Sequence, residues 1–236
     1  MSLDSVGNAD PDEPDQRLEI VIDLPAGDPI GSIVWLHGLG QDASVMRGIS
    51  EAIGLTGVRS VYVSAPYRMV GMVRTTPVRA WFMQKITRMD EGDLTTLNDA
   101  KSQLREIVDA ESAVVGAGRV VIAGFSQGAA MATSVALHHP ERLACLALYA
   151  PFIVREDLAD ATRSDANAQL PVWIGHGRRD WTVPIKMGRA VRNILHGWGH
   201  PVTWQSYPGI HEPFPDAGPD LRRFLDENLI APGAVA

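Results

Sequence analysis

Ser126 lies in the sequence GFSQG at 124–128, a G-x-S-x-G pattern. The pattern alone is weak, because an ordinary glycine-bracketed turn between a strand and a helix would also contain it. Its surroundings are more specific, since a β-branched run at 120–123 precedes it and an apolar segment at 131–138 follows it. A strand, a tight turn and a helix around such a serine are typical of a nucleophile elbow, which exposes the serine hydroxyl. Ser126 is therefore the candidate nucleophile.

A serine hydroxyl becomes a strong nucleophile when a histidine removes its proton and an acid orients that histidine. On the fold that carries nucleophile elbows, the acid and then the histidine follow the serine along the chain. Asp180 comes shortly after an apolar run at 171–175, and His211 lies in a glycine- and proline-containing loop after 202–207. We expect Asp180 and His211 to be these partners, with His176 as an alternative base.

Glycines also follow an apolar run in the sequence LHGLGQ at 36–41. Glycines let backbone N–H groups turn inward, and an oxyanion hole combines one amide from such a loop with the amide after the nucleophile. The candidate donors are the backbone amides of Leu39 and Gln127. We expect His37 to brace this loop rather than to transfer protons.

Seven short apolar runs alternate with segments of helical spacing, which is typical of an α/β sheet. Some of the runs are apolar without alternation, as expected for parallel strands that are covered on both faces. We predict a doubly wound, mainly parallel sheet of about seven strands with helices on both faces, and the candidate residues at one edge of it. The strand runs lie at 18–24, 32–37, 60–65, 119–125, 143–149, 171–175 and 202–207, and helical stripes lie within 97–108, 191–198 and 221–229.

The segment at 66–92 fits neither period, although it is rich in apolar and aromatic residues. A connection of this length in a compact domain is usually functional or disordered. Two interpretations stay open here: a flap over a binding site, or an apolar cluster packed beneath a loop. If the segment is a flap, Trp81 and Phe82 are candidate walls of a substrate pocket. Trp181, directly after the candidate acid, is a third candidate pocket residue.

The chain has 236 residues, enough for one large domain or two small ones. Residues 1–17 are polar and acidic, so we expect a disordered N-terminal arm there. The alternation of elements then predicts a single domain over 18–230 and a flexible tail at 231–236. No apolar run approaches the ~18 residues of a membrane span, and no secretory signal is visible. We therefore expect a cytoplasmic protein without integral membrane association.

The net charge is −7, from 28 acidic and 21 basic residues, which argues against nucleic-acid binding. Without residues 1–17 there remain 23 acids and 20 bases, a charge of −3 that suits an uncharged substrate. The lone cysteine, Cys145, rules out an intramolecular disulfide, and the sequence motifs of phosphate loops, zinc proteases and dinucleotide sites are absent. We expect neither a metal nor an organic cofactor.

Four motifs together resemble the carboxylesterase, lysophospholipase and acyl-protein thioesterase family of small α/β hydrolases. They are the glycine loop at 36–40, the elbow at 124–129, the acid loop at 175–184 and the histidine loop at 207–212. The similarity extends from about Leu18 to Leu229. The resemblance implies the α/β-hydrolase fold, with Ser126, Asp180 and His211 as the catalytic residues.

The sequence departs from the pattern of that family at three places. Met83 and Gln84 follow the Trp81–Phe82 pair where the family often carries an acid, and the sequence YAPF at 149–152 replaces a Ser-Gly turn. Trp181 is bulkier than the small apolar residue expected there. All three concern the walls of the pocket, so they affect the choice of substrate more than the type of reaction.

The combined motifs predict a serine hydrolase that cleaves carboxylic esters with short to medium acyl chains. A lysophospholipase or acyl-protein thioesterase with the same three residues is the alternative enzyme, because all pass through the same acyl-enzyme. A non-catalytic binder of a small ligand on the same fold is the alternative of another class. The expected partner is a small acyl ester, and a homodimer is compatible with the charge.

Overall fold

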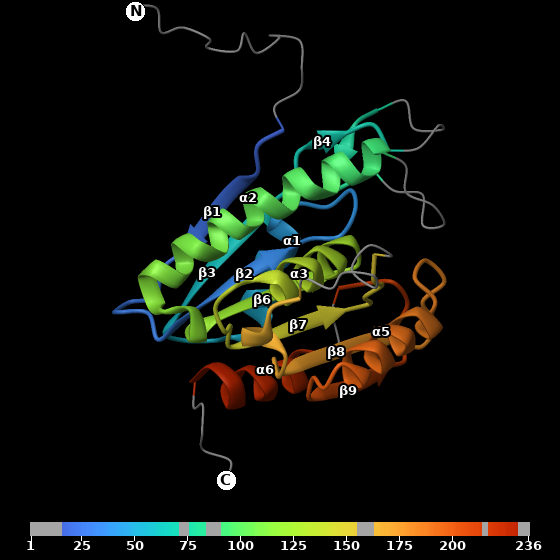
Figure 1. Ribbon diagram of the computed structural model, residues 1–236. Helices are drawn as coiled ribbons and strands as arrows, with labels where there is room; N and C mark the ends of the chain where they lie inside the picture. The colour runs from blue at the N-terminus through green and yellow to red at the C-terminus, as the bar shows by residue number, and fades with distance from the viewer. Residues whose placement is uncertain (1–15, 71–75, 84–90, 155–162, 214–216, 231–236) are drawn as a thin grey trace, which may run out of the picture.

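The computed structural model describes residues 16–70, 76–83, 91–154, 163–213 and 217–230. Its centre is a seven-stranded sheet with the strand order β1-β3-β2-β6-β7-β8-β9 (Figure 1). β1 is antiparallel to β3, and every other neighbouring pair is parallel. The strands are β1 (Glu19–Asp23), β2 (Gly31–Leu36), β3 (Val58–Ser64), β6 (Val120–Phe125), β7 (Cys145–Tyr149), β8 (Val172–Gly177) and β9 (Val202–Tyr207).

Helices cover both faces of this sheet (Figure 1). One apolar cluster packs α2, α3 and α5 against one face, and a second cluster packs α1 and α6 against the other. The helices are α1 (Ala43–Ile53), α2 (Glu91–Val115), α3 (Gln127–His138), α5 (Ile185–Gly197) and α6 (Gly218–Leu225), with short helical turns η1 (Ala117–Arg119), η2 (Asp165–Asn167) and η3 (Asp226–Ile230). The predicted doubly wound α/β architecture is confirmed.

Burial along the strands follows from this layering. Every residue of β2, β6, β7 and β8 is buried, because helices on both faces leave these strands no solvent-facing side. β1 lies at an edge of the sheet, and the first four of its residues are exposed. All seven predicted strands are present, with ends that agree within two residues. The last helical stripe is divided, since α6 ends at Leu225 and the π-helical turn η3 continues to Ile230.

The segment at 66–92 is described in part. It contains a small antiparallel hairpin of β4 (Tyr67–Arg68) and β5 (Val78–Arg79), followed by the fully buried side chains of Trp81 and Phe82. Residues 71–75 and 84–90 lie outside the described residues, so a flap over a binding site stays a prediction. Residues 1–15 of the expected arm at 1–17 and the expected tail at 231–236 lie outside them as well. None of the described helices is long and apolar enough to cross a membrane.

Candidate active site

Ser126 occupies the sharp turn between β6 and α3. Its backbone angles, φ 53° and ψ −116°, lie in a region that residues other than glycine rarely adopt. The neighbouring glycines are required by close backbone contacts. A Cβ atom at Gly124 would lie 2.4 Å from the carbonyl oxygen of Gly128, and one at Gly128 would lie 2.3 Å from the carbonyl oxygen of Leu36. The turn is therefore the strained, tightly packed elbow that the sequence predicts.

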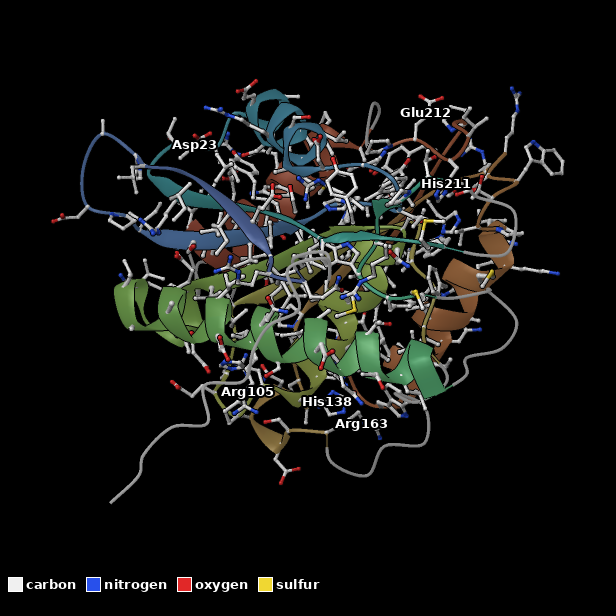
Figure 2. All side chains as sticks on the ribbon, turned by 90° about the horizontal axis from the view of Figure 1, so that it is seen from above. Asp23, Arg105, His138, Arg163, His211 and Glu212 are labelled. Atoms are coloured by element: carbon white, nitrogen blue, oxygen red, sulfur yellow. The ribbon has the colours of Figure 1, made fainter. Side chains whose placement is uncertain are left out.

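His211 connects this serine to Asp180. Its Nε2 atom lies 3.0 Å from the Ser126 hydroxyl, and its Nδ1 atom lies 2.7 Å from Asp180 Oδ2. When Nδ1–H donates to the carboxylate, Nε2 is left as the acceptor for the serine proton. The side chain of Asp180 is fully buried, whereas that of His211 is 17% exposed. Figure 2 shows His211 and Glu212 together at one end of the sheet, with Asp23 toward the other.

Asp180 is held by backbone amides in the turn after β8. Its Oδ1 atom accepts hydrogen bonds from the N–H groups of Thr182 at 3.0 Å and Val183 at 2.8 Å. These two donors leave Oδ2 for the contact with His211. His176 is buried, and its Nε2 atom lies 2.8 Å from the carbonyl oxygen of Val183 and 3.5 Å from Asp180 Oδ2. Burial lowers the pKa of His176, and its Nε2–H donates to the carbonyl oxygen of Val183. It contacts the acid loop, while His211 is the histidine that lies within hydrogen-bond distance of Ser126.

Backbone contacts join the acid loop to the histidine loop. The amide of Arg178 donates to Tyr207 O at 2.7 Å, and the amide of Arg179 donates to Gly209 O at 2.9 Å. The ring of Phe125, the residue before the serine, lies 4.8 Å from the His211 ring, centroid to centroid. Together these contacts position the imidazole from the acid side and from the elbow side.

The loop after β2 approaches the same edge of the sheet. Within the described part of the chain, neither the Leu39 amide nor the Gln127 amide donates a hydrogen bond to a protein group. Both amides therefore stay candidates for an oxyanion hole. The amide of Gly40 donates to Arg79 O at 2.8 Å, and the amide of Gly38 donates to Gln41 Oε1 at 3.0 Å. The residues on both sides of Leu39 are thus restrained while its own amide is not engaged.

Hydrogen bonds at both ring nitrogens join His37 to this loop and to the chain after β3. Its Nε2 atom accepts the amide hydrogen of Ala65 at 2.9 Å, so Nδ1 carries the ring proton and donates to Gly38 O at 2.7 Å. Burial lowers the pKa of His37 to about 4, which keeps the ring neutral near pH 7. A neutral ring with both nitrogens engaged fits a bracing role better than proton transfer.

The three aromatic candidates for the pocket have very different surroundings. Trp81 and Phe82 have no exposed surface and belong to the core cluster under α2 and α3. Neither side chain presents a surface to solvent, so their role as walls of a substrate pocket stays a prediction. Trp181 is 86% exposed beside the acid loop, so it stays a candidate contact for a substrate.

The side chain of Gln127 is a part of the site that sequence reasoning missed. Its carboxamide oxygen accepts the amide hydrogen of Trp81, and its carboxamide nitrogen donates to Phe82 O. No local signal predicts this contact, since the partners lie about 45 positions away in the sequence. Within the described residues, no group of three His, Cys, Asp or Glu side chains could hold a metal ion.

A family model and several known proteins match most of this chain. The model of the phospholipase/carboxylesterase family matches residues 19–229. Acyl-protein thioesterase 1 of Gibberella zeae is 27% identical over 90% of this chain and 97% of its own length, and a probable carboxylesterase of Oryza sativa is 26% identical over 79% and 83%.

Solved structures share the fold. Acyl-protein thioesterase 2 of Zea mays has a TM-score of 0.76 at 22% identity, with 89% of this chain and 99% of that one covered. The structure of esterase PE8 has a TM-score of 0.75 at 23% identity, with 90% and 100% covered. Because the family match spans nearly all of the described elements, this chain belongs to the phospholipase/carboxylesterase family and is an α/β-fold hydrolase.

Proposed function

We propose that the protein hydrolyses carboxylic esters with short to medium acyl chains through an acyl-enzyme on Ser126. The observation that carries the proposal is a pair of contacts at His211, whose Nε2 lies in position to accept the Ser126 hydroxyl proton while its Nδ1 lies against the Asp180 carboxylate. This is the arrangement that a serine needs in order to lose its proton to a base of defined tautomer.

In the proposed reaction, Ser126 Oγ attacks the ester carbonyl carbon while His211 Nε2 takes the hydroxyl proton. The negative charge that develops on the carbonyl oxygen is stabilised by the amides of Leu39 and Gln127. Collapse of the tetrahedral intermediate breaks the ester bond, and the imidazolium gives its proton to the leaving alcohol. Water then attacks the acyl-enzyme with the same base and releases the acid. Asp180 orients the imidazole and stabilises its charged form.

The residues in the loops around Ser126 and His211 support a preference for an uncharged acyl group. Leu39, Trp181 and Ile210 all expose apolar surface, and each lies in a loop that contributes to the site. Apolar rims favour apolar groups, because contact removes both surfaces from water.

The test is hydrolysis of an aryl-ester series of rising acyl length by wild type and by Ser126→Ala. We expect the substitution to lower kcat/KM at least about a thousandfold, since no other described group offers a nucleophile to His211. Ser134→Ala is the matched control, because this serine is buried on α3, the helix that follows Ser126, and its loss should leave the rate unchanged. A rate that survives in Ser126→Ala would contradict the proposal.

Thioester hydrolysis is the second candidate activity, and the names of several relatives favour it, such as acyl-protein thioesterase 1 of Gibberella zeae. Paired oxygen esters and thioesters of equal chain length would separate the two activities. Turnover restricted to long-chain thioesters would replace the simple ester hydrolase by a thioesterase. Failure of a fluorophosphonate probe to label Ser126 would favour a non-catalytic binder instead.

A further inference from the structure

The carboxamide of Gln127 holds the backbone of the segment that follows β5. Its Oε1 atom accepts the amide hydrogen of Trp81 at 3.0 Å, and its Nε2 atom donates to Phe82 O at 2.9 Å. Gln127 is 5% exposed, and the two partner residues are fully buried. Water cannot replace hydrogen bonds at such a site, so the two bonds fix this segment against the elbow.

The same segment holds the loop after β2. The indole N–H of Trp81 donates to His37 O at 2.8 Å, and the rings of the two residues lie 5.0 Å apart. Two positions earlier, Arg79 O accepts the amide hydrogen of Gly40 at 2.8 Å. The loop is thus held on both sides of Leu39, through the carbonyl of His37 and through the amide of Gly40.

These bonds form a continuous connection between the two amides proposed to bind the oxyanion. Leu39 and Gln127 lie 88 positions apart in the sequence and belong to turns after different strands. Two donors stabilise one oxygen atom only if their separation is held to within about 0.5 Å. The sheet alone brings the turns to the same edge, while the side chains of Gln127 and Trp81 join them directly.

We propose that the side chains of Gln127 and Trp81 are positioning residues, which hold the Leu39 and Gln127 amides at the separation that the oxyanion requires. The inference rests on the proposed ester hydrolysis and adds to it. Neither side chain touches the reacting atoms: Trp81 is fully buried, and Gln127 contributes its carboxamide to the segment and its backbone amide to the oxyanion.

A purely structural role makes a different prediction. If these side chains only stabilise the fold, their loss lowers the melting temperature but leaves kcat unchanged at temperatures where the protein is folded. If they position the amides, their loss lowers kcat in the folded protein and leaves KM almost unchanged, because the ground-state ester depends less on the oxyanion hole.

The experiment compares Trp81→Phe and Gln127→Met with wild type. Trp81→Phe keeps an aromatic ring and removes the indole N–H, while Gln127→Met keeps the side-chain length and the backbone amide. The matched control is Trp35→Phe, because Trp35 is also fully buried and its indole N–H donates to Ser60 Oγ, away from the oxyanion loop. All assays are run at one temperature, at least about 20 °C below the lowest Tm of the set, so that the native state of every variant is populated.

We expect kcat to fall about 10- to 100-fold in Trp81→Phe and in Gln127→Met, with KM within about twofold of wild type. The inhibition constant of an aryl trifluoromethyl ketone should rise by the same factor as kcat falls, because its adduct with Ser126 carries an oxyanion in the same place. Trp35→Phe should lower Tm and leave kcat unchanged.

Two outcomes would overturn the inference. If Ser126→Ala abolishes hydrolysis while Trp81→Phe and Gln127→Met retain the wild-type kcat and inhibitor affinity, the positioning role is wrong and the proposed function stands. If Ser126→Ala itself retains the wild-type rate, the proposed function is wrong, and the inference fails with it.

Discussion

At the scale of single residues, the site depends on groups that are held in one protonation state and one orientation. His37 is the clearest example, because burial, the amide of Ala65 and the carbonyl of Gly38 together select its neutral Nδ1–H tautomer. A charged ring would lose the acceptor that Ala65 needs. The proposed oxyanion loop therefore depends on the neutrality of a histidine that takes no part in the proposed chemistry.

This neutrality has a consequence for stability. The pKa of His37 is about 4 in the folded protein and about 6.5 in the unfolded chain. Between these values the unfolded state binds more protons, so the stability contributed by neutral His37 is fully present above about pH 6.5 and is lost as the pH falls toward about 4. In His37→Gln the free energy of unfolding should depend less steeply on pH in this window, by up to about 1.4 kcal/mol per pH unit.

Urea denaturation at a series of pH values between 4 and 7 measures this difference. His196→Gln is the control, since His196 is exposed on α5 and should leave the curve parallel to that of wild type. Parallel curves for His37→Gln and wild type would show that His37 is not held neutral.

At the scale of elements, a buried ion pair ties α2 to the sheet at the edge away from the candidate site. Glu111 on α2 is 4% exposed, and it accepts hydrogen bonds from Arg59 of β3 at 2.8 Å and from the Ser32 hydroxyl of β2 at 2.6 Å. Ser32 lies near the start of its strand, whereas the loop after β2 that approaches Ser126 follows its end. The ion pair thus fixes α2 near the amino-terminal ends of β2 and β3, while the candidate site lies at the carboxyl ends of the strands.

Glu111→Ala should lower the free energy of unfolding by about 3 kcal/mol, because it leaves a mostly buried Arg59 without its carboxylate. The catalytic rate of the folded variant should match wild type, since the substitution lies at the other edge of the sheet. Chemical denaturation combined with ester hydrolysis measures both quantities. Glu106→Ala, at an exposed position of the same helix, is the matched control and should change neither. A large loss of rate in folded Glu111→Ala would contradict this division between the two edges.

At the scale of the whole molecule, a parallel sheet brings distant turns to one edge. The turns after β2, β6 and β8 and the loop after β9 carry Leu39, Ser126, Asp180 and His211, although these residues span most of the chain. Because these strands run in the same direction, their carboxyl ends lie at the same edge of the sheet, and the turns that follow them are neighbours. The candidate site is a property of the topology as much as of its residues.

The predicted acidic N-terminal arm contributes most of the protein's net negative charge. Deletion of residues 1–15 removes five acids and no base, so the net charge changes from −7 to −2. Among the described residues, the hydrogen bonds of the chain before β1 begin at Gln16, whose carbonyl accepts from Gln103 Nε2. Because the deletion leaves Gln16 in place, we expect Tm to stay within about 2 °C of wild type. The rate with a neutral ester should also be unchanged, because such a substrate is not steered by charge. Thermal unfolding and ester hydrolysis test this, and a clear loss of Tm would show that the arm packs on the domain.

Much of this protein could be predicted from sequence patterns alone. Buried strands such as β6 are recognisable because continuous apolar residues reflect coverage on both faces, and the glycines around Ser126 reflect backbone contacts that a Cβ atom would obstruct. The order of Ser126, Asp180 and His211 along the chain is also visible, since each follows a recognisable strand. Periodicity and turn residues are local properties, so they are readable without the fold.

Only the tertiary structure decided which side chains meet across the turns. It brings His211 rather than His176 to the Ser126 hydroxyl, across 85 positions of sequence. It also buries Trp81 and Phe82, which are candidate walls of a substrate pocket on the sequence alone, and it joins their backbone to the side chain of Gln127. The physical reason is that the period of a segment shows which of its faces is buried, but carries no information about the distant group that will cover that face.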